Sequence, residues 1–254
     1  MHGPAGVLTV VLFETALGAL ALLWVAPLWG VVRPGFFKLV GATVLVCAAL
    51  AWLAGRSGLD QAGASGRAAL LWLALFTLAV LVWQVLLYAR VAGSRWAGIA
   101  AVAPGLVATW PLAVLSGRTV LGALALLTGA LFLGATVDGL LLGHWYLVDR
   151  RLSNRPILAL ATWFIAGVAF ALVSAALGGA RGEEVNRSLS PLLAFPNLTV
   201  YLAVGLVLLC GLLASFIRVL VRSNSIQAAT GMFYLAVIMA LAAEFAAKVY
   251  FFPA

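Results

Sequence analysis

The stretch TGALFLGATVDGLLLGHWYLVDRRLSNRP, residues 128–156, decides the fold class of this chain. It closes a long apolar run, and about 20 apolar residues suffice for a helix to cross a bilayer. One carboxylate, Asp138, lies inside the run, which ends in His144, two aromatic residues and a cluster of arginines. This combination of a buried charge, small residues and a basic loop occurs nowhere else in the sequence. It predicts a membrane helix that ends at a positively charged surface.

The composition extends this prediction to the whole chain. Of 254 residues, 65% are apolar and 9% are charged, and the mean hydropathy is +1.18, whereas soluble domains carry about 25% charged residues. The long Ala/Leu/Val runs do not alternate as barrel strands do. We therefore predict an all-α, polytopic helical bundle with the lipid bilayer as its first partner. The net charge of +8 lies mainly at span ends, where topology explains it, so nucleic acid is excluded as a partner.

Hydropathy predicts about eight transmembrane spans within one integral membrane domain, residues 1–254. Trp72, Trp96 and Tyr201 lie near span ends, as interfacial aromatic residues do. Pro111 is expected to bend the fourth span. The predicted spans are 6–31, 36–54, 68–88, 96–115, 120–148, 157–178, 197–221 and 226–251.

The distribution of Lys and Arg predicts the orientation. Loops after the odd-numbered spans hold nine basic residues, Arg33, Lys38, Arg90, Arg95, Arg150, Arg151, Arg155, Arg218 and Arg222. The opposite side holds six, Arg56, Arg67, Arg118, Arg181, Arg187 and Lys248. Cytoplasmic loops are enriched in Lys and Arg. We therefore expect both termini on the outer side of a bacterial inner membrane.

The two halves of the chain, residues 1–118 and 119–254, share a weak echo. The first span reads FETALGALALLW and leads to Arg33-Pro34, and the fifth reads TVDGLLLGHW and leads to Arg155-Pro156. A tandem four-plus-four duplication would explain the echo and would preserve orientation. Ordinary membrane-helix composition would explain it as well.

Three carboxylates lie within predicted spans, Glu14, Asp138 and Glu244. Burying a charge in the bilayer costs about 2.5–3.5 kcal/mol or more, so such groups usually face the bundle interior and often mark proton or substrate paths. All three are candidates for a proton relay, and all three could equally be structural polar contacts. Lys248 follows Glu244 by four residues, which predicts an ion pair on one helix face. Glu14 has no such neighbour, so its partner must come from another helix, from water or from a bound proton.

Glycines surround Asp138 on its helix. Gly134 precedes it by four residues, and Gly139 and Gly143 form a GxxxG spacing that lets a second helix approach. His144 lies about 240° around the helix from Asp138, so these two residues do not form a pair.

His144, Trp145 and Tyr146 are expected at the inner interface. The histidine there is a solvated interfacial group, a residue that accepts protons from the aqueous side, or a hydrogen-bond donor to a quinone head group. The three residues are our candidates for a quinone or head-group site.

The arginines after the fifth predicted span form a basic loop. Arg150, Arg151 and Arg155 are candidates for docking anionic lipid or a partner protein. Cys47 and Cys210 are isolated in apolar runs and are expected to be small buried hydrophobes. The sequence offers no ligand pattern for haem, iron–sulfur, zinc or copper, so quinone is the one cofactor that we consider.

Eight spans without cofactor ligands, together with the FETALGALALL segment, resemble the quinone-binding membrane subunits of the polysulfide-reductase type. The resemblance is to general architecture, without a matching diagnostic motif, and it implies quinone binding. Our first hypothesis is an integral subunit of a redox or respiratory complex that binds quinone or conducts protons without its own metal, alongside other protein subunits. A proton-coupled small-solute or ion transporter and a non-catalytic membrane scaffold are the alternatives. The sequence contains no recognisable catalytic cluster, so it leaves open whether the chain is an enzyme.

Overall fold

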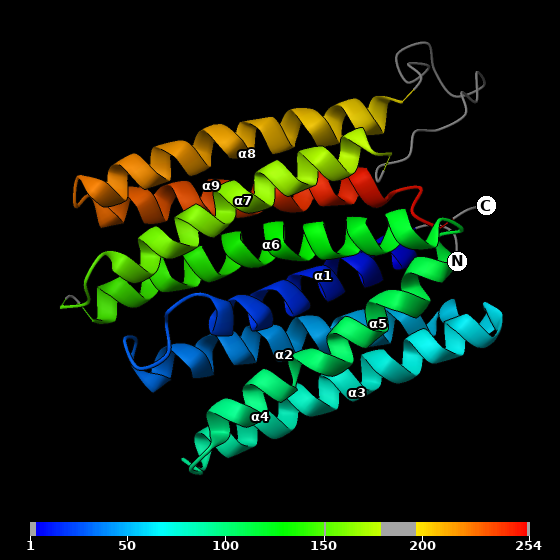
Figure 1. The fold of residues 1–254 in the computed structure, drawn as a ribbon, viewed down its shortest axis with the longest axis horizontal. Helices are drawn as coiled ribbons and strands as arrows, with labels where there is room; N and C mark the ends of the chain where they lie inside the picture. Colours follow the sequence, from blue (N-terminus) through cyan, green and yellow to red (C-terminus); the bar gives the residue numbers. More distant parts are fainter. Residues whose placement is uncertain (1–3, 150, 179–196, 253–254) are drawn as a thin grey trace.

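The structure, a computed structural model, describes residues 4–149, 151–178 and 197–252. Within these residues it is all-α, and eight helical spans are long and apolar enough to cross a membrane, which confirms the predicted fold class. A bilayer offers the backbone no hydrogen-bond partners, so each span satisfies its own N–H and C=O groups as a helix. The helices (Figure 1) are α1 Pro4–Val25, α2 Pro34–Arg56, α3 Gly63–Tyr88, α4 Ser94–Ala100, α5 Val102–Leu115, α6 Thr119–Val148, α7 Arg155–Ala176, α8 Leu198–Arg222 and α9 Ile226–Lys248, with a short 3-10 helix at Leu59–Gln61.

The first span is shorter than predicted. Helix α1 ends at Val25, not at residue 31, and residues 26–33 form a compact turn. Pro27 explains the early end, because proline lacks the N–H that would continue the helix and disfavours helical geometry in the residue before it.

The fourth span is divided into α4 and α5, with the break at Ala101. Pro104 accounts for the break, because a proline ring clashes with the carbonyl of the residue four positions earlier, here Ala100. Pro111, where we expected a bend, lies within the uninterrupted helix α5.

The helices pack in the same order in the two halves of the chain. Neighbours along the chain are neighbours in space, from α1 through α2 and α3 to α5, and from α6 through α7 and α8 to α9. Between the halves, α1 packs against α6, while α5 contacts α6 and α9 contacts α1. Exchanging the two halves maps these three contacts onto one another, whereas the contact of α2 with α6 belongs to one half alone.

The third helix of each half ends in the same local structure. After α3, Arg90 has φ +55° and the N–H of Val91 bonds to Leu86 O at 3.0 Å; after α8, Asn224 has φ +60° and the N–H of Ser225 bonds to Leu220 O at 2.9 Å. A left-handed residue followed by this six-residue hydrogen bond is a Schellman ending. The two halves therefore share a helix ending that is not apparent from their sequences.

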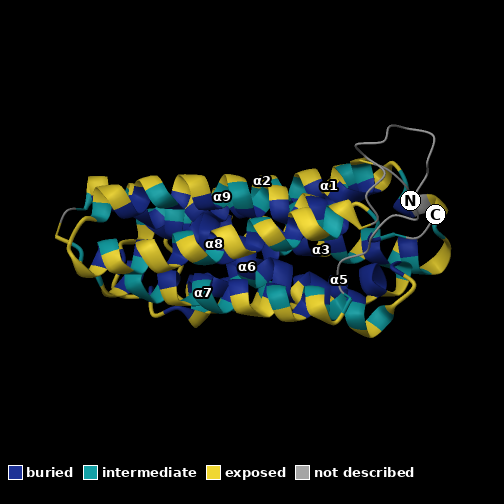
Figure 2. Cartoon of the chain, turned by 90° about the horizontal axis from the view of Figure 1, so that it is seen from above, coloured by how far each residue is buried: buried dark blue, intermediate teal, exposed yellow. Residues whose placement is uncertain are grey.

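Helices α1 and α6 form the centre of the bundle. Both are mostly buried, whereas α2, α3, α8 and α9 turn much of their surface outward, as the exposed bands in Figure 2 show. The two central helices run in the same direction and touch through their backbones. A Cβ atom on Gly18 would clash with the carbonyl of Ala130, and one on Gly134 would clash with the backbone of Gly18. Small residues permit this close approach.

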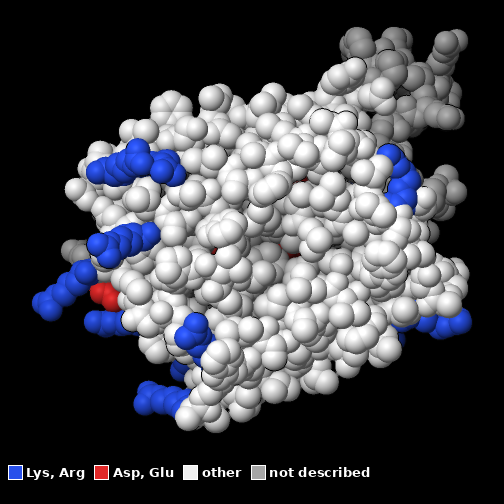
Figure 3. All heavy atoms as spheres, viewed as in Figure 1, with Lys and Arg blue, Asp and Glu red and all other residues white. Residues whose placement is uncertain are grey.

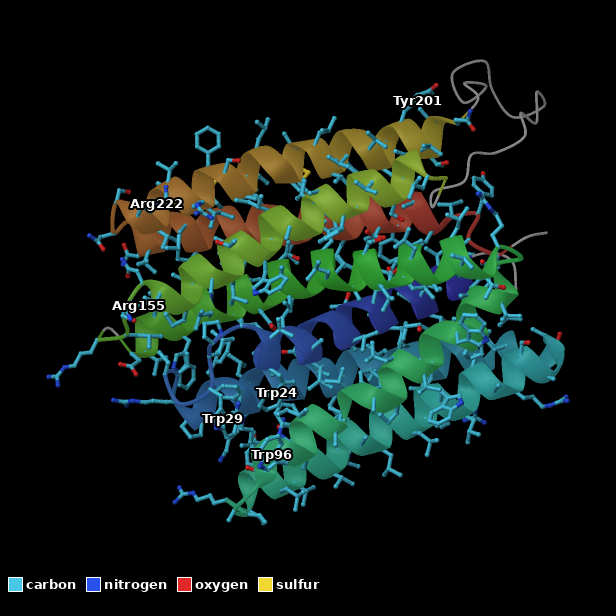
Figure 4. All side chains as sticks on the ribbon, in the orientation of Figure 1. Trp24, Trp29, Trp96, Arg155, Tyr201 and Arg222 are labelled. Atoms are coloured by element: carbon cyan, nitrogen blue, oxygen red, sulfur yellow. The ribbon has the colours of Figure 1, made fainter. Side chains whose placement is uncertain are left out.

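The bundle has two distinct ends. The end that carries both termini (Figure 1) is called here the terminal end, and the opposite end the basic end. Trp24, Trp29 and Trp96 lie at the basic end and Tyr201 lies near the terminal end (Figure 4). Trp96 and Tyr201 are 68% and 69% exposed, as expected for interfacial aromatic residues. The described basic residues at the basic end are Arg33, Lys38, Arg90, Arg95, Arg151, Arg155, Arg218 and Arg222.

Candidate functional site

Glu14 lies in the middle of α1 and is completely buried. Its carboxylate fits against α6 because residue 129 is a glycine. A Cβ atom on Gly129 would lie 2.6 Å from Glu14 Oε1 and 2.8 Å from its Cδ. The glycine therefore makes the space that the carboxylate occupies.

The partner of Glu14 is Lys248, near the end of α9. Lys248 Nζ forms an ion pair with Glu14 Oε1 at 2.9 Å, and it donates hydrogen bonds to Glu244 Oε2 and to the carbonyl of Ala125 on α6, both at 3.1 Å. An ammonium group has three donors; two of them have hydrogen-bond acceptors here, and the contact with Glu14 is an ion pair. The predicted Glu244–Lys248 pair is confirmed, and another helix supplies the partner of Glu14.

Glu14, Lys248 and Glu244, called the triad below, carry an unbalanced charge when all three groups are ionised. Lys248 is 3% exposed and Glu244 4% exposed, so bulk solvent screens the charges of the triad little. Two carboxylates and one ammonium group sum to −1, and an unneutralised charge in a low-dielectric interior is costly. Uptake of one proton makes the triad neutral. The arrangement is suited to binding and releasing a proton.

A small polar cavity lies beside the triad, among α6, α7, α8 and α9. It has a volume of about 30 Å³ and is lined by Thr128, Ser174, Glu244, Lys248 and small apolar residues. A cavity of roughly 10–15 Å³ holds one water, so this one has room for about two. Water there would adjoin both charged groups of α9. The sequence did not single out Thr128 or Ser174, because an isolated hydroxyl in an apolar helix usually bonds its own backbone.

Substitution of Gly129 tests the space that holds Glu14. We expect Gly129→Ala to displace the carboxylate from Lys248 and to lower the free energy of unfolding by roughly 1–3 kcal/mol, the usual cost of overpacking. Thermal unfolding in detergent measures this. Gly205→Ala in α8 is the matched control, because nothing lies within 4 Å of its added Cβ. Equal melting temperatures for the two variants would contradict the proposed contact.

Asp138 lies on α6 and is also completely buried. Neither of its carboxyl oxygens has a hydrogen-bond partner among the residues that the structure describes. An ionised carboxylate without a partner costs far more than a neutral carboxylic acid. Asp138 is therefore compatible with this packing as the neutral acid, or with a partner that arrives when the helices move.

The triad and Asp138 share helix α6 but do not touch. Asp138 follows Gly129 by nine residues, which is about 14 Å along the helix axis. The backbone contact between Gly18 and Gly134 lies between the two levels. The three candidate relay carboxylates are thus two groups, one ion-paired and one isolated, separated by a tightly packed segment.

The three candidates for a head-group site point to three different neighbours. Tyr234 on α9 is hydrogen-bonded to His144, with its hydroxyl 2.9 Å from Nε2. Trp145 packs over Gly35 of α2. Tyr146 donates to the carbonyl of Ser153 at 2.5 Å. His144 and Tyr234 are both exposed on the bundle surface, so the histidine has gained a partner that the sequence did not suggest.

The basic loop is only partly covered by the structure. Arg151 and Arg155 are exposed, and Arg150 lies outside the described residues, as do residues 179–196, which include Arg181 and Arg187. Asp149 pairs with Arg33 at 3.0 Å.

Comparison with known proteins adds no assignment. No protein-family model matches the chain, and no curated protein or solved structure is significantly similar to it.

Proposed function

We propose that the chain is a proton-translocating subunit of a redox or respiratory-type complex in a bacterial inner membrane, with the basic end toward the cytoplasm. The observation that carries this proposal is the triad, a buried site in which Lys248 bridges Glu14 and Glu244 at 2.9 and 3.1 Å and leaves one negative charge over. The extra carboxylate gives the site a place for one exchangeable proton.

The proton would enter from the terminal end. The polar cavity beside Glu244 and Lys248 can hold water next to the triad. Asp138, on the other side of the Gly18–Gly134 contact, would accept this proton after releasing its own toward the basic end. Because about 14 Å of packed helix separates the two levels, transfer requires α1 and α6 to separate transiently, so that water connects the acids. A closed barrier prevents a proton leak when no reaction drives the subunit.

We propose in addition that the subunit binds a quinone head group at His144 and Tyr234. They form a hydrogen-bonded pair on the outer surface of α6 and α9, where a lipid-soluble quinone could reach it. Trp145 and Tyr146 are engaged elsewhere and are not assigned to this site.

Proton flux tests the assignment of the acids. We expect Glu14→Gln and Asp138→Asn each to lower proton translocation at least tenfold in proteoliposomes that contain the intact complex, because each removes a protonatable group and keeps the side-chain volume. An entrapped pH-sensitive dye measures the flux. Thr43→Val, at a half-buried site in α2 whose hydroxyl bonds only its own helix, is the control. Flux that survives both substitutions would remove these acids from the mechanism.

A proton-coupled transporter of a small solute is the second candidate. It is favoured by the placement of the triad between the two four-helix halves, since transporters built from repeats bind their substrates at the repeat interface near the midplane. Purification under native conditions separates the two candidates. Copurifying redox subunits and bound quinone support the first, and a chain that isolates alone and moves solute against a proton gradient supports the second. A scaffold would lose thermal stability on these substitutions and keep the activity of its assembly.

A further inference from the structure

The outer face of the α7–α8 pair at the basic end carries a concentration of positive charge. We call the strip of surface where α7 and α8 lie side by side the basic groove, a name for this line of contact and not for a cavity, and define it by Arg155 and Thr162 on α7 and by Arg218 and Arg222 on α8. Figure 3 shows most of the blue side chains of this face at the end of the bundle where these helices meet. Arg155 and Arg222, labelled in Figure 4, lie at this same end on adjacent helices.

Side-chain hydrogen bonds connect the two helices beside the basic groove. Asn154, just before α7, donates from its amide to the side-chain oxygen of Asn224 and, at 3.3 Å, to the carbonyl of Val221 at the end of α8. The start of α7 is thereby fixed against the end of α8. The basic groove is a preformed surface rather than a set of independent side chains.

Arg218 is half-buried at the basic groove, and most of its hydrogen-bond donors are unused. Its Nη1 donates to Thr162 Oγ1 at 2.9 Å, and Thr162 Oγ1 in turn donates to the carbonyl of Leu158 at 2.9 Å. A guanidinium group has five donors, and within the described part of the chain this is its one hydrogen bond. The remaining donors are available to an external acceptor.

The charges of the groove have no internal counterion. Arg218 and Arg222 are four residues apart and therefore lie on one face of α8, where like charges repel. Among the residues that the structure describes, no carboxylate pairs with Arg155, Arg218 or Arg222, and Asp149 at this end pairs with Arg33. An anion between the two helices would neutralise this excess.

We propose that the basic groove binds the phosphate of an anionic phospholipid from the leaflet at the basic end. Arg218 lies about 6 Å from Arg222 along α8, one turn further from the basic end. Basic pockets between membrane helices are established sites for anionic headgroups. Arg218 and Arg222 hold the phosphate, Thr162 orients Arg218, and Arg155 closes the groove from α7. The site is distinct from the triad and does not depend on proton translocation.

Native mass spectrometry of the purified chain tests this proposal with phosphatidylglycerol and phosphatidylcholine of the same acyl chains. We expect phosphatidylglycerol to bind the wild type preferentially and the double variant R218Q/R222Q to bind it roughly 10- to 30-fold more weakly, as the loss of two charges near the membrane surface implies. The control R90Q/R95Q removes two charges from the same end of the other half and should bind like the wild type. Thr162→Val keeps every charge and should weaken binding severalfold, because Arg218 is no longer oriented.

Three results would overturn the proposal. Equal binding of the two lipids would show that the phosphate charge is not recognised. Equal losses in R218Q/R222Q and R90Q/R95Q, with both variants melting like the wild type, would show only a diffuse positive surface. Displacement of phosphatidylglycerol by equimolar inorganic phosphate would show that the groove takes a free anion instead of a lipid.

Discussion

Lys248→Met is expected to lower the free energy of unfolding by roughly 3–5 kcal/mol, the cost of removing one partner from a buried ion pair. Lys248 Nζ satisfies Glu14, Glu244 and the carbonyl of Ala125 at once. Methionine fills a similar volume but leaves two carboxylates and a carbonyl without a donor. Thermal unfolding in detergent, together with the yield of folded protein, measures the loss.

Two further variants separate this charge effect from a loss of packing. Adding Glu14→Gln and Glu244→Gln to Lys248→Met leaves no charge at the site, and this triple variant should recover most of the lost stability. Lys38→Met removes a lysine near a helix start at the basic end and should have a small effect. A triple variant as unstable as Lys248→Met would show that the ion pairs are not what the lysine supplies.

Gly134→Leu is expected to have the other large effect, preventing the close approach of α1 and α6. A Cβ at residue 134 would already overlap the backbone of Gly18 and lie 2.6 Å from the amide nitrogen of Ala19. The neighbouring atoms belong to a backbone and cannot rotate away. We expect a loss of roughly 3 kcal/mol or more, at the upper end of the cost of overpacking, measured as a fall in melting temperature.

Gly231→Leu is the control for this substitution. Gly231 lies in α9 with nothing within 4 Å of its added Cβ, so a leucine there projects outward and should change stability little. If Gly134→Leu and Gly231→Leu melt alike, the direct contact between the central helices is wrong.

Much of the fold follows from the sequence because the bilayer leaves few choices. Long apolar runs with charged or proline-containing boundaries become helices, and all eight spans were located in this way. The errors fall where proline chemistry acts within an apolar run. Pro27 ends α1 six residues early and Pro104 divides the fourth span. A hydropathy profile does not detect a helix end or a helix break within an apolar run.

Only the contacts of the site that lie within one helix could be predicted from the sequence. The Glu244–Lys248 pair follows from a spacing of four residues, and it is present at 3.1 Å. The contact between Lys248 and Glu14 joins the two ends of the chain, across 234 residues of separation. It depends on the parallel packing of α1 and α6 and on the glycine at position 129 that admits the carboxylate. No local pattern encodes that arrangement.

The candidates for a head-group site also show that sequence proximity does not predict a shared site. His144, Trp145 and Tyr146 are consecutive, and consecutive helix residues point about 100° apart. They therefore contact α9, α2 and the loop before α7, respectively. Proximity in sequence suggested one site, whereas helical geometry distributes the residues over three neighbours.

Infrared difference spectroscopy of the carboxyl groups tests most directly whether the triad binds one exchangeable proton. The C=O stretch of a protonated carboxylic acid, followed through a pH titration in H₂O and D₂O, reports that proton. We predict that the wild type shows an isotope-sensitive band that titrates, and that both Glu14→Gln and Glu244→Gln, which balance Lys248 with one remaining carboxylate, remove it and stay folded. Asp138→Asn should leave this band in place. A titrating band that persists unchanged in both glutamine variants would contradict the account.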